Sequence, residues 1–352
     1  MEKISDVEII APNFKRRLSG VTSTIIQLVP VQRALGQKVA ALGPGLPAAL
    51  PHIGYLALLR LWDRPSARKR RIWHARRNVE MLPAILLRDL LRMPLKIVFT
   101  SASQRRHSAW TKFLIRRMDA VIATSSRTAG YLEVPSTTIP HGIDAGRFFP
   151  AADKRASKAA LGLPADRKIA GCFGRVRHQK GTDLFVDSMI ALLPHRPDWI
   201  AIIAGRATGP HLAFENGLKE RVRQAGLSDR ILFVGEHTNI PDWYRALDLF
   251  VAPQRWEGFG LTPLEAMATR VPVVATDVGA FSELLTTGSD ETGLLIAANS
   301  LPSMVEAAAS LMDDPDRAAR AGERGLARAI ARFSIEGEAS RIGAVYDALF
   351  AL

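Results

Sequence analysis

Two glutamates eight positions apart frame the segment of this chain that is best equipped for chemistry. It reads Glu257-Gly258-Phe259-Gly260-Leu261-Thr262-Pro263-Leu264-Glu265. Pro263 suits the first turn of a helix, so Glu257 is expected in a glycine loop and Glu265 about one turn inside the helix. Such a loop offers backbone amides to an anion, and both carboxylates can accept hydrogen bonds from hydroxyls. The combination favours a ligand that joins a polyol to a phosphate, although the helix dipole alone also favours acidic residues there.

A second candidate loop is strongly cationic. The apolar run 169–173 predicts a strand, and it leads into Gly174-Arg175-Val176-Arg177-His178-Gln179-Lys180-Gly181 before a helical stretch. Fixed charges on Arg175 and Lys180, together with helix amides, suit a phosphate or diphosphate. The loop lacks the Gly-Lys-Ser/Thr ending of a Walker loop and the Gly-x-Gly-x-x-Gly pattern of a dinucleotide site. A solvated cationic loop explains the same residues equally well.

The first half of the chain holds weaker candidates. Gly20, in Leu18-Ser19-Gly20-Val21, is expected in a strand-to-helix turn, where its amide could meet the far side of a bound phosphate. His74, with Arg76 close by, and His107 could act as a base or bind an acceptor anion. The competing interpretations are an ordinary turn glycine and structural or surface histidines.

Strand and helix patterns alternate along both halves of the chain. In the first half, strands are expected at 4–10, 38–42, 72–74, 95–100 and 120–124, and helices at 21–36 and 104–118. A Pro- and Gly-rich linker follows at 134–150. In the second half, five strands are expected at 169–173, 199–204, 230–234, 249–252 and 273–275, and helices at 183–193, 212–225, 263–270, 301–312 and 334–352. This order predicts βαβ units and a doubly wound parallel sheet.

Composition restricts the class of protein further. The chain has 352 residues, of which 47% are hydrophobic and 23% charged, values typical of a globular protein with about two domains. It has no apolar run long enough to span a membrane and no secretory signal pattern at its start. A single cysteine, Cys172, cannot form an internal disulfide or a thiolate metal site. A cytosolic location is therefore expected.

Basic residues are concentrated in one half. Residues 1–150 hold 24 Lys and Arg against 9 Asp and Glu, a balance of +15, whereas residues 151–352 hold 23 against 25, a balance of −2. Solubility, a nucleic-acid face, or an anionic membrane or acidic substrate could each explain this excess. Aromatic residues are sparse, at 7%, and no nucleic-acid recognition module is present, so no nucleic-acid partner is predicted.

The predicted helix 104–118 is basic and amphipathic. Trp110, Phe113, Leu114 and Met118 recur at helical spacing, and the polar face carries Arg105, Arg106, Lys112, Arg116 and Arg117. Such a helix either lies on an anionic bilayer or packs its apolar stripe into the core.

Together these motifs resemble a known family. The chain is similar to the retaining, nucleotide-sugar-dependent glycosyltransferases of family 4, which have the GT-B fold. The resemblance rests on Gly174-Arg175, Lys180-Gly181, Phe233-Val234-Gly235, Glu257–Ala268, Pro272–Thr276 and the linker Pro140-His141-Gly142-Ile143-Asp144. It implies two Rossmann-like domains facing across a cleft: an acceptor domain at 1–145, onto which a last helix at 334–352 packs back, and a donor domain at 146–333.

The resemblance also implies roles for residues. Arg175 and Lys180 should neutralise the donor diphosphate, and Glu257 should contact hydroxyls of the donor sugar. The loop after Val234 should cradle the base, and Glu265 should bind the ribose. Further donor contacts are expected at Gly20, Gly258, Phe259, Gly260, Leu261 and Thr262, and acceptor contacts at His74, Arg76 and His107. Ser19-Gly20 stands where many relatives carry two glycines, and Ala102 where many carry a histidine.

The expected reaction needs no metal ion. Metal-dependent transferases use an Asp-x-Asp site, and here that pattern occurs only in Asp314-Pro315-Asp316, at an apparent helix junction far from the candidate loops. Two cations and helix amides can stabilise the departing diphosphate instead.

Resemblance at 173–180 and 73–78 indicates a hexosyltransferase of the envelope mannosyltransferase kind. The expected donor is GDP-mannose, and the expected acceptor is an anionic Kdo–lipid A at the cytoplasmic face of the inner membrane. An enzyme that uses a UDP-sugar, or a sugar-nucleotide epimerase of the same fold, is the alternative.

Overall fold

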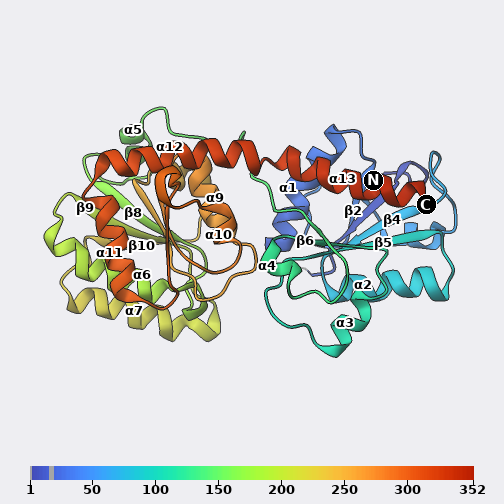
Figure 1. Cartoon of the computed structure of the whole chain (residues 1–352), viewed down its shortest axis with the longest axis horizontal. Helices are drawn as coiled ribbons and strands as arrows, with labels where there is room; N and C mark the ends of the chain where they lie inside the picture. The colour runs from blue at the N-terminus through green and yellow to red at the C-terminus, as the bar shows by residue number, and fades with distance from the viewer. Residues whose placement is uncertain (1, 16–19) are drawn as a thin grey trace. The chain divides into compact units, whose positions relative to one another are not determined.

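The computed structural model describes residues 2–15 and 20–352, which form two α/β units. The first unit is Met1–Gly142 together with Ile335–Leu352, and the second is Ile143–Ser334. In Figure 1 the first unit therefore contains both the blue start and the red end of the chain. The sequence places the domain boundaries after 145 and after 333, whereas the chain changes unit after Gly142 and after Ser334.

The described part of the first unit is built on seven parallel strands in the order β3-β2-β1-β4-β5-β6-β7. The order runs outward in both directions from the β1–β4 pair, as in a doubly wound sheet, whose ligands bind beyond the carboxyl ends of the strands. The strands are β1 (Ile9–Pro12), β2 (Val39–Leu42), β3 (His52–Ile53), β4 (Arg71–Ala75), β5 (Leu95–Ser101), β6 (Ala120–Ala123) and β7 (Thr137–Thr138).

Helices cover both faces of this sheet because its central strands are apolar on both sides. Ile10 and Trp73 point to the layer that contains α2 and α3, whereas Ile9 and Ile72 point to α1 and α13. The helical elements are η1 (Ile4–Asp6), α1 (Gly20–Ala34), η2 (Tyr55–Arg60), α2 (Asn78–Ile85), η3 (Leu86–Leu90), α3 (Ala109–Ile115), α4 (Ser126–Ala129) and α13 (Ile335–Ala351).

The second unit has six parallel strands in the order β10-β9-β8-β11-β12-β13, with the chain order reversing at the β8–β11 pair. The predicted doubly wound parallel architecture is confirmed. The strands are β8 (Lys168–Phe173), β9 (Trp199–Ala204), β10 (Ile231–Gly235), β11 (Leu249–Ala252), β12 (Val273–Thr276) and β13 (Leu294–Ile296).

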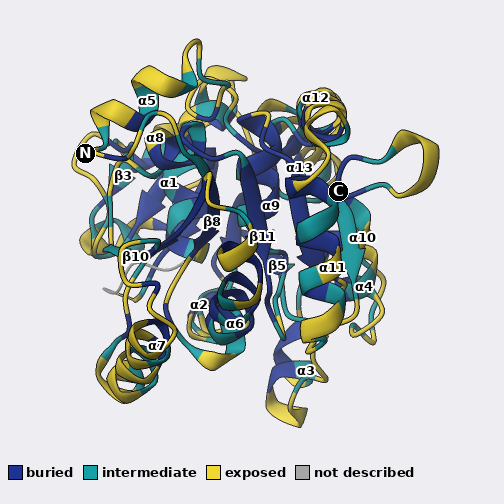
Figure 2. Ribbon diagram, turned by 90° about the vertical axis from the view of Figure 1, so that its left-hand side faces the viewer, coloured by how far each residue is buried: buried dark blue, intermediate teal, exposed yellow. Residues whose placement is uncertain are grey.

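Two helical layers also enclose this second sheet. One core cluster joins it to α6, α7 and α11, and the other joins it to α8, α9, α10 and the end of α12. In Figure 2 the central strands β8 and β11 are mostly dark blue, and the outer turns of helices such as α7 are yellow. The helical elements are α5 (Lys154–Ala160), η4 (His178–Lys180), α6 (Thr182–Leu192), η5 (Leu193–His195), η6 (Gly209–His211), α7 (Leu212–Gln224), α8 (Ile240–Arg245), α9 (Leu261–Ala268), α10 (Phe281–Leu284), η7 (Gly288–Asp290), α11 (Leu301–Met312) and α12 (Pro315–Arg332).

Several sequence-based expectations are wrong in detail. The second sheet has a sixth strand, β13, and the long helix α12 was not predicted. The expected helix 104–118 shortens to α3, because the Ser108 side chain accepts a hydrogen bond from the Thr111 amide at 3.3 Å and caps the helix there. The linker 134–150 contains the edge strand β7, and the start of the expected strand 4–10 is a 3-10 turn.

Candidate functional site

The loop between β8 and α6 carries the two cations expected at a diphosphate. Arg175 is exposed in this loop, and the neighbouring Val176 is fully buried and anchors it. The loop ends at Gly181, whose φ is +70°. A Cβ at this position would collide with the carbonyl oxygen of Pro253, so the close approach of the two loops requires glycine.

Lys180 reaches from this loop to the glycine loop that follows β11. Its Nζ donates a hydrogen bond to Oε2 of Glu257, and the two side chains are only 20% and 16% exposed. The other oxygen of Glu257, Oε1, accepts the Gly258 amide at 3.1 Å. The ion pair therefore joins two residues that lie 77 positions apart in the chain and holds both charged groups in one place.

The glycine loop turns directly into α9. Gly260 has a φ of +82°, and a Cβ on it would meet the ring of Phe281 and the side chain of Glu257. Phe259 is buried in the core and anchors the loop there. α9 then begins at Leu261, so the first amides of a helix follow the glycine loop that carries Glu257, which is a suitable place for an anion.

Arg255 connects these two loops and was not predicted from the sequence. Its guanidinium donates to both carboxylate oxygens of Asp183, at 2.6 and 2.9 Å, and to the His178 carbonyl at 2.6 Å. Burial tends to raise the pKa of Asp183, but hydrogen bonds and charge from Arg255 outweigh burial and lower it. Because Arg255 lies two residues before Glu257 and binds the segment that carries Lys180, it positions both partners of the ion pair.

Glu265 lies on α9, and its carboxylate accepts a hydrogen bond from the Tyr244 hydroxyl at 2.8 Å. Burial raises the pKa of Glu265, and Tyr244, Arg147 and Lys180 partly oppose that rise. Tyr244 is fully buried, so burial and the nearby Glu265 raise its pKa well above 10. Glu265 is thus within the electrostatic influence of Lys180, while Tyr244 and Arg147 are additions that no sequence motif indicated.

The loop after β10 is fixed by a histidine. His237 Nε2 donates to the Val234 carbonyl at 2.7 Å, and its ring stacks on Trp243 with centroids 4.2 Å apart. The loops after β8, β10 and β11 all leave the carboxyl edge of the second sheet. This edge therefore gathers the predicted residues of the second unit, and an ion pair joins Lys180 to Glu257 there.

Gly20 belongs to the other unit, where it is the first residue of α1. It is exposed, and no heavy atom lies within 4 Å of a Cβ built on it. The preceding Ser19 lies outside the described residues.

His74 is completely buried in β4. Its Nδ1 lies 2.6 Å from the Tyr346 hydroxyl, and its Nε2 lies 2.6 Å from Thr100 Oγ1. Burial, assisted by the charge of Arg76, lowers the pKa of His74 well below 6.5, so the ring is neutral. This geometry favours the structural histidine over a side chain that reaches an acceptor.

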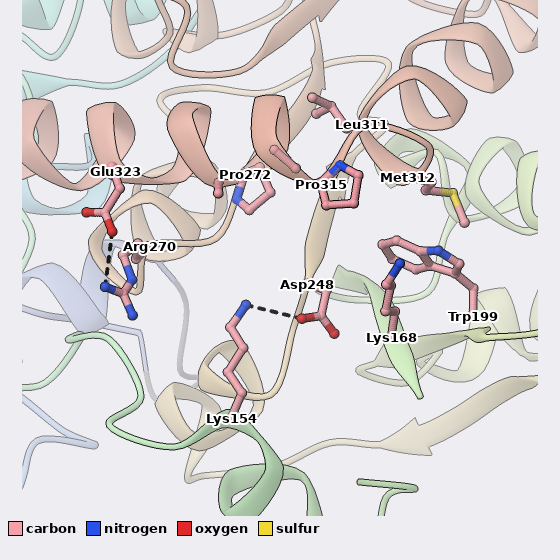
Figure 3. Close-up of a pocket in the computed structure, with 12 residues that line it drawn as sticks. Lys154, Lys168, Trp199, Asp248, Arg270, Pro272, Leu311, Met312, Pro315 and Glu323 are labelled. Carbon is pink, nitrogen blue, oxygen red and sulfur yellow. Dashed lines mark hydrogen bonds and ion pairs between the residues drawn. The ribbon is translucent and has the colours of Figure 1, made fainter. Parts of the chain in front are cut away.

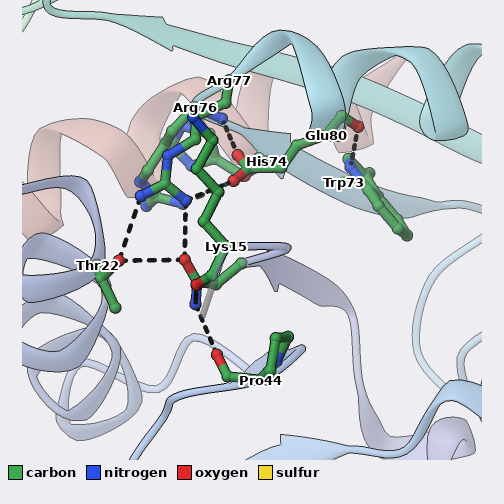
Figure 4. A network of polar contacts seen from close by, with 9 residues as sticks. Lys15, Thr22, Pro44, Trp73, His74, Arg76, Arg77 and Glu80 are labelled. Atoms are coloured by element: carbon green, nitrogen blue, oxygen red, sulfur yellow. Dashed lines mark hydrogen bonds and ion pairs between the residues drawn. The ribbon is translucent and has the colours of Figure 1, made fainter. Parts of the chain in front are cut away.

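Arg76 and Arg77 follow β4 and are held by a buried carboxylate. Glu80 accepts the Arg76 amide at 2.7 Å and Arg77 Nη1 at 3.0 Å. Arg77 also donates to Asn13 at 2.8 Å and to Thr22 at 3.2 Å, which connects the ends of β4, β1 and the start of α1. Figure 4 shows this network converging on the two arginines. Burial raises the pKa of Glu80, against the opposing effect of the arginines.

His107 lies apart from this network, in the segment before α3. It is partly buried, and its Nε2 has no hydrogen-bond partner among the described residues. Burial, then the charges of Arg105 and Lys112, lower its pKa. The contacts of His74 and His107 share no residue, so the structure does not bring the two histidines together.

A pocket of about 430 Å³ in the second unit lies away from these residues (Figure 3). It is formed where β8, β9 and β11 begin, so it occupies the amino edge of the sheet. Its charged groups pair with one another, Lys154 with Asp248 at 3.3 Å and Arg270 with Glu323 at 3.1 Å. It includes none of the predicted site residues.

Solved structures share this fold along almost the whole chain. The crystal structure of Anabaena HepE in complex with UDP superimposes with a TM-score of 0.83 at 18% identity, covering 97% of this chain and all of that one. A sucrose-phosphate synthase from Thermosynechococcus elongatus gives a TM-score of 0.79 at 23% identity, over 98% and 99% of the two chains. Two Rossmann-like units with parallel, doubly wound sheets make up the GT-B fold, which this chain shares with these structures.

The sequence comparisons identify the family. The model of the family "Glycosyl transferases group 1" matches residues 153–328. The lipopolysaccharide core biosynthesis mannosyltransferase LpsB of Rhizobium meliloti is 75% identical over 349 residues, 99% of each chain. LpcC of Rhizobium leguminosarum bv. viciae, which has the same description, is 59% identical over 99% of this chain and 98% of that one. The chain belongs to the group 1 glycosyltransferase family and is an enzyme of that class.

Within residues 2–15 and 20–352, no helix has the length and apolar character needed to cross a membrane. Over the same ranges, no group of three or more His, Cys, Asp or Glu side chains could hold a metal ion. Asp314, from the Asp-x-Asp pattern, caps α12 by accepting the Arg317 amide at 2.9 Å.

Proposed function

We propose that the enzyme transfers mannose from GDP-mannose to a lipopolysaccharide core acceptor of the Kdo–lipid A type, with retention of anomeric configuration. The observation that carries this proposal is the 75% identity, over 99% of both chains, to a lipopolysaccharide core mannosyltransferase. The ion-paired loops at the carboxyl edge of the second sheet supply a place for the donor. An acceptor of this type is anionic, which agrees with the +15 balance of residues 1–150.

The chemical task at that edge is to stabilise charge. When the bond between the sugar C1 and the diphosphate oxygen breaks, negative charge grows on the leaving GDP, and fixed cations and amides near that oxygen lower the barrier. Lys180 and Arg175 act as those cations, and the amides from Phe259 to Thr262 complete the anion site. Glu257 accepts hydroxyls of the sugar, and Glu265 accepts those of the ribose.

Retention is proposed to follow a same-face route. The acceptor oxygen bonds to C1 on the face that the diphosphate leaves, and its proton passes to an oxygen of the leaving phosphate. This route needs no carboxylate nucleophile of the kind used in double displacement. Mass spectrometry of the enzyme during turnover should show no glycosyl adduct, and a trapped adduct on any carboxylate would overturn the route.

We further propose that no metal takes part, because Lys180, Arg175 and the α9 amides supply the positive charge. Activity should survive dialysis against a chelator. Activity that is lost with chelator and restored by Mg²⁺ or Mn²⁺ would contradict this part of the proposal.

The acceptor is proposed to meet the first unit at the cytoplasmic face of the inner membrane. Arg76, beside the buried Glu80, and His107 are the candidate contacts, and His74 positions the backbone that carries Arg76. Binding to vesicles that contain anionic lipid should fall steeply with added salt. Equal binding to neutral vesicles would contradict the role of charge.

The test of the whole proposal combines donor binding with product analysis. GDP should raise the melting temperature more than UDP or ADP, since a ligand that binds only the folded state stabilises it. With GDP-mannose and Kdo–lipid A, one hexose should be added to the lipid. A larger shift with UDP would instead indicate a UDP-sugar enzyme, and conversion of the donor without acceptor would indicate an epimerase.

A further inference from the structure

The outer side of the η2–α2–η3–α3 layer in the first unit exposes large apolar side chains. Leu56, Leu59 and Leu90 are 81%, 69% and 72% exposed. Trp62, Trp110 and Phe113 are each about half exposed. We call these six residues the apolar ridge. On α3 the sequence allowed an apolar stripe packed in the core, but only Leu114 of its members on that helix is buried, and Trp110 and Phe113 lie outside.

Hydrogen bonds and packing join the segments of the ridge. Trp62 Nε1 donates to the Leu91 carbonyl at 2.9 Å, which connects the end of the η2 segment to the end of η3. Asn78 Nδ2 donates to Thr111 Oγ1 at 2.7 Å, and α2 packs on α3. Trp110 and Phe113 stack with centroids 5.6 Å apart. The ridge is therefore carried by one connected layer rather than by separate loops.

Exposed arginines border the ridge. Arg64 follows Trp62, Arg92 follows η3, and Arg105 and Arg106 precede α3. None of these four forms an ion pair with an acidic group among the described residues, whereas Lys112, Arg116 and Arg117 further along are paired with Glu133 or Asp89. A layer with protruding leucines, two tryptophans and unpaired arginines combines the features of a surface that enters the headgroup region of a bilayer.

We propose that this layer is a membrane-insertion surface: the apolar ridge enters an anionic phospholipid bilayer, and the four bordering arginines bind lipid phosphates. The inference rests on, and deepens, the membrane partner of the proposed function, because it adds an apolar component to electrostatic attraction. A second copy of the chain is a poorer occupant, since a twofold interface would place the same arginine cluster against itself.

The first experiment measures co-sedimentation with vesicles of phosphatidylcholine alone or with phosphatidylglycerol added. The wild-type chain should bind the anionic vesicles, and a fraction of that binding should persist in about 0.5 M salt. Electrostatic attraction is largely screened at that ionic strength, so the persisting fraction measures the apolar contribution. The variant Leu56→Ser/Leu59→Ser/Leu90→Ser should lose that salt-resistant fraction and bind at least about tenfold more weakly at low salt. The matched control Leu212→Ser/Leu301→Ser/Ile330→Ser removes three exposed apolar side chains of the second unit and should bind like wild type.

A second readout locates the ridge directly. Tryptophan fluorescence should be quenched by lipids brominated on their acyl chains, and Trp62→Phe/Trp110→Phe should remove most of that quenching. The proposal is overturned if salt abolishes all vesicle binding of the wild type, or if the serine variant binds as well as its control. It is also overturned if light scattering shows a dimer that the serine variant dissociates, because the ridge would then be an interface between copies.

These experiments separate the surface from the reaction. The vesicles contain no acceptor, so vesicle binding does not depend on which sugar is transferred. The serine variant should keep the wild-type melting shift with GDP, because none of its substitutions lies in the second unit. If the wild type binds vesicles through the ridge but shows no shift with any nucleotide, the proposed function fails and the membrane surface stands.

Discussion

Charged side chains are paired at the carboxyl edge of the second sheet, whereas arginines beside the apolar ridge of the first unit have no acidic partner among the described residues. At the sheet edge, Lys180 is paired with Glu257, and Arg255 is paired with Asp183 through two hydrogen bonds. Beside the ridge, Arg92 and Arg105 are exposed and have no acidic partner among the described residues. Pairing fixes a geometry, which suits a ligand of one shape, whereas unpaired exposed charge suits a partner that has no fixed shape.

This contrast predicts which property a substitution in each region should change. A site that must stabilise developing charge needs its groups in place before the reaction, because reorganisation would cost part of the gain. A membrane surface needs only net charge and apolar area, and single residues can be exchanged there with small effects. Substitutions at the sheet edge should therefore act on turnover, and substitutions at the ridge on partitioning.

The largest effect is expected for Lys180→Ala. Loss of a preorganised charge that stabilises a leaving group typically lowers kcat by about 100-fold to 1,000-fold. The matched control is Lys154→Ala, which removes a lysine paired with Asp248 at the opposite edge of the same sheet. Steady-state kinetics with a water-soluble acceptor should show the loss only for Lys180→Ala. Comparable kinetics for the two variants would remove the basis for treating the carboxyl edge as the reaction site.

Substitution of arginines beside the ridge should have the next largest effect, and this effect should be on vesicle binding rather than on turnover. A basic residue near an anionic leaflet contributes about 1 kcal/mol, so Arg105→Gln/Arg106→Gln should weaken binding to anionic vesicles by roughly 30-fold. Turnover of a water-soluble acceptor should stay at the wild-type value. Arg116→Gln/Arg117→Gln, which removes two paired arginines of the same region, is the control and should have a smaller effect on vesicle binding. Equal losses for both pairs would mean that pairing is irrelevant.

Arg255 is expected to act by positioning Lys180 and Glu257 rather than by contacting substrate. Arg255→Met should therefore lower kcat by about tenfold, because the two loops that carry this ion pair are no longer held together. Asp183→Asn should lower kcat by a similar factor, because it breaks the ion pair between Arg255 and Asp183. The double variant should therefore have a kcat little lower than that of either single variant. A positioning role also predicts that Arg255→Lys restores part of kcat with little change in KM. Strict additivity of the two single effects would show that Arg255 and Asp183 act separately.

The buried His74 in the core of the first unit should affect stability, in contrast to the exposed ridge residues, which should affect membrane binding. The pKa of His74 is lowered by burial, so the folded state excludes a proton that the unfolded state takes up below about pH 6.5. This contribution to stability is present above that pH and is lost as the pH falls. Between pH 7.5 and 5.5 the free energy of unfolding should drop by about 1.4 kcal/mol more in wild type than in His74→Gln. Denaturant titrations at the two pH values measure it, and parallel pH profiles would contradict a neutral buried ring.

Much of the architecture could be predicted from local sequence. Runs such as 169–173 and 199–204 are apolar throughout, as strands buried on both faces must be, and they were placed almost at their observed bounds. The strand β13 escaped because it has only three residues, Leu294–Ile296. α12 escaped because its Ala- and Arg-rich sequence has few large apolar residues to mark a helix face.

The candidate site was predictable only in part. Glycines and charges near one another in the chain, such as Gly258 and Glu257, leave a local pattern. Arg255 with Asp183, Tyr244 with Glu265, and His74 with Tyr346 leave none, because each pair forms only when distant segments meet; His74 and Tyr346 lie 272 positions apart. The exposure of Trp110 and Phe113 could not be predicted either, since helical spacing does not say which side of a helix faces the sheet.

The central claim is that positive groups at the carboxyl edge of the second sheet bind the diphosphate of the donor. Calorimetric titration of GDP and of guanosine into wild type and Arg175→Ala/Lys180→Ala tests it most directly. We expect the double variant to bind GDP at least about 100-fold more weakly, a loss of about 2.7 kcal/mol, while its affinity for guanosine is unchanged. Unchanged affinity of the double variant for GDP would show that Arg175 and Lys180 do not bind the diphosphate.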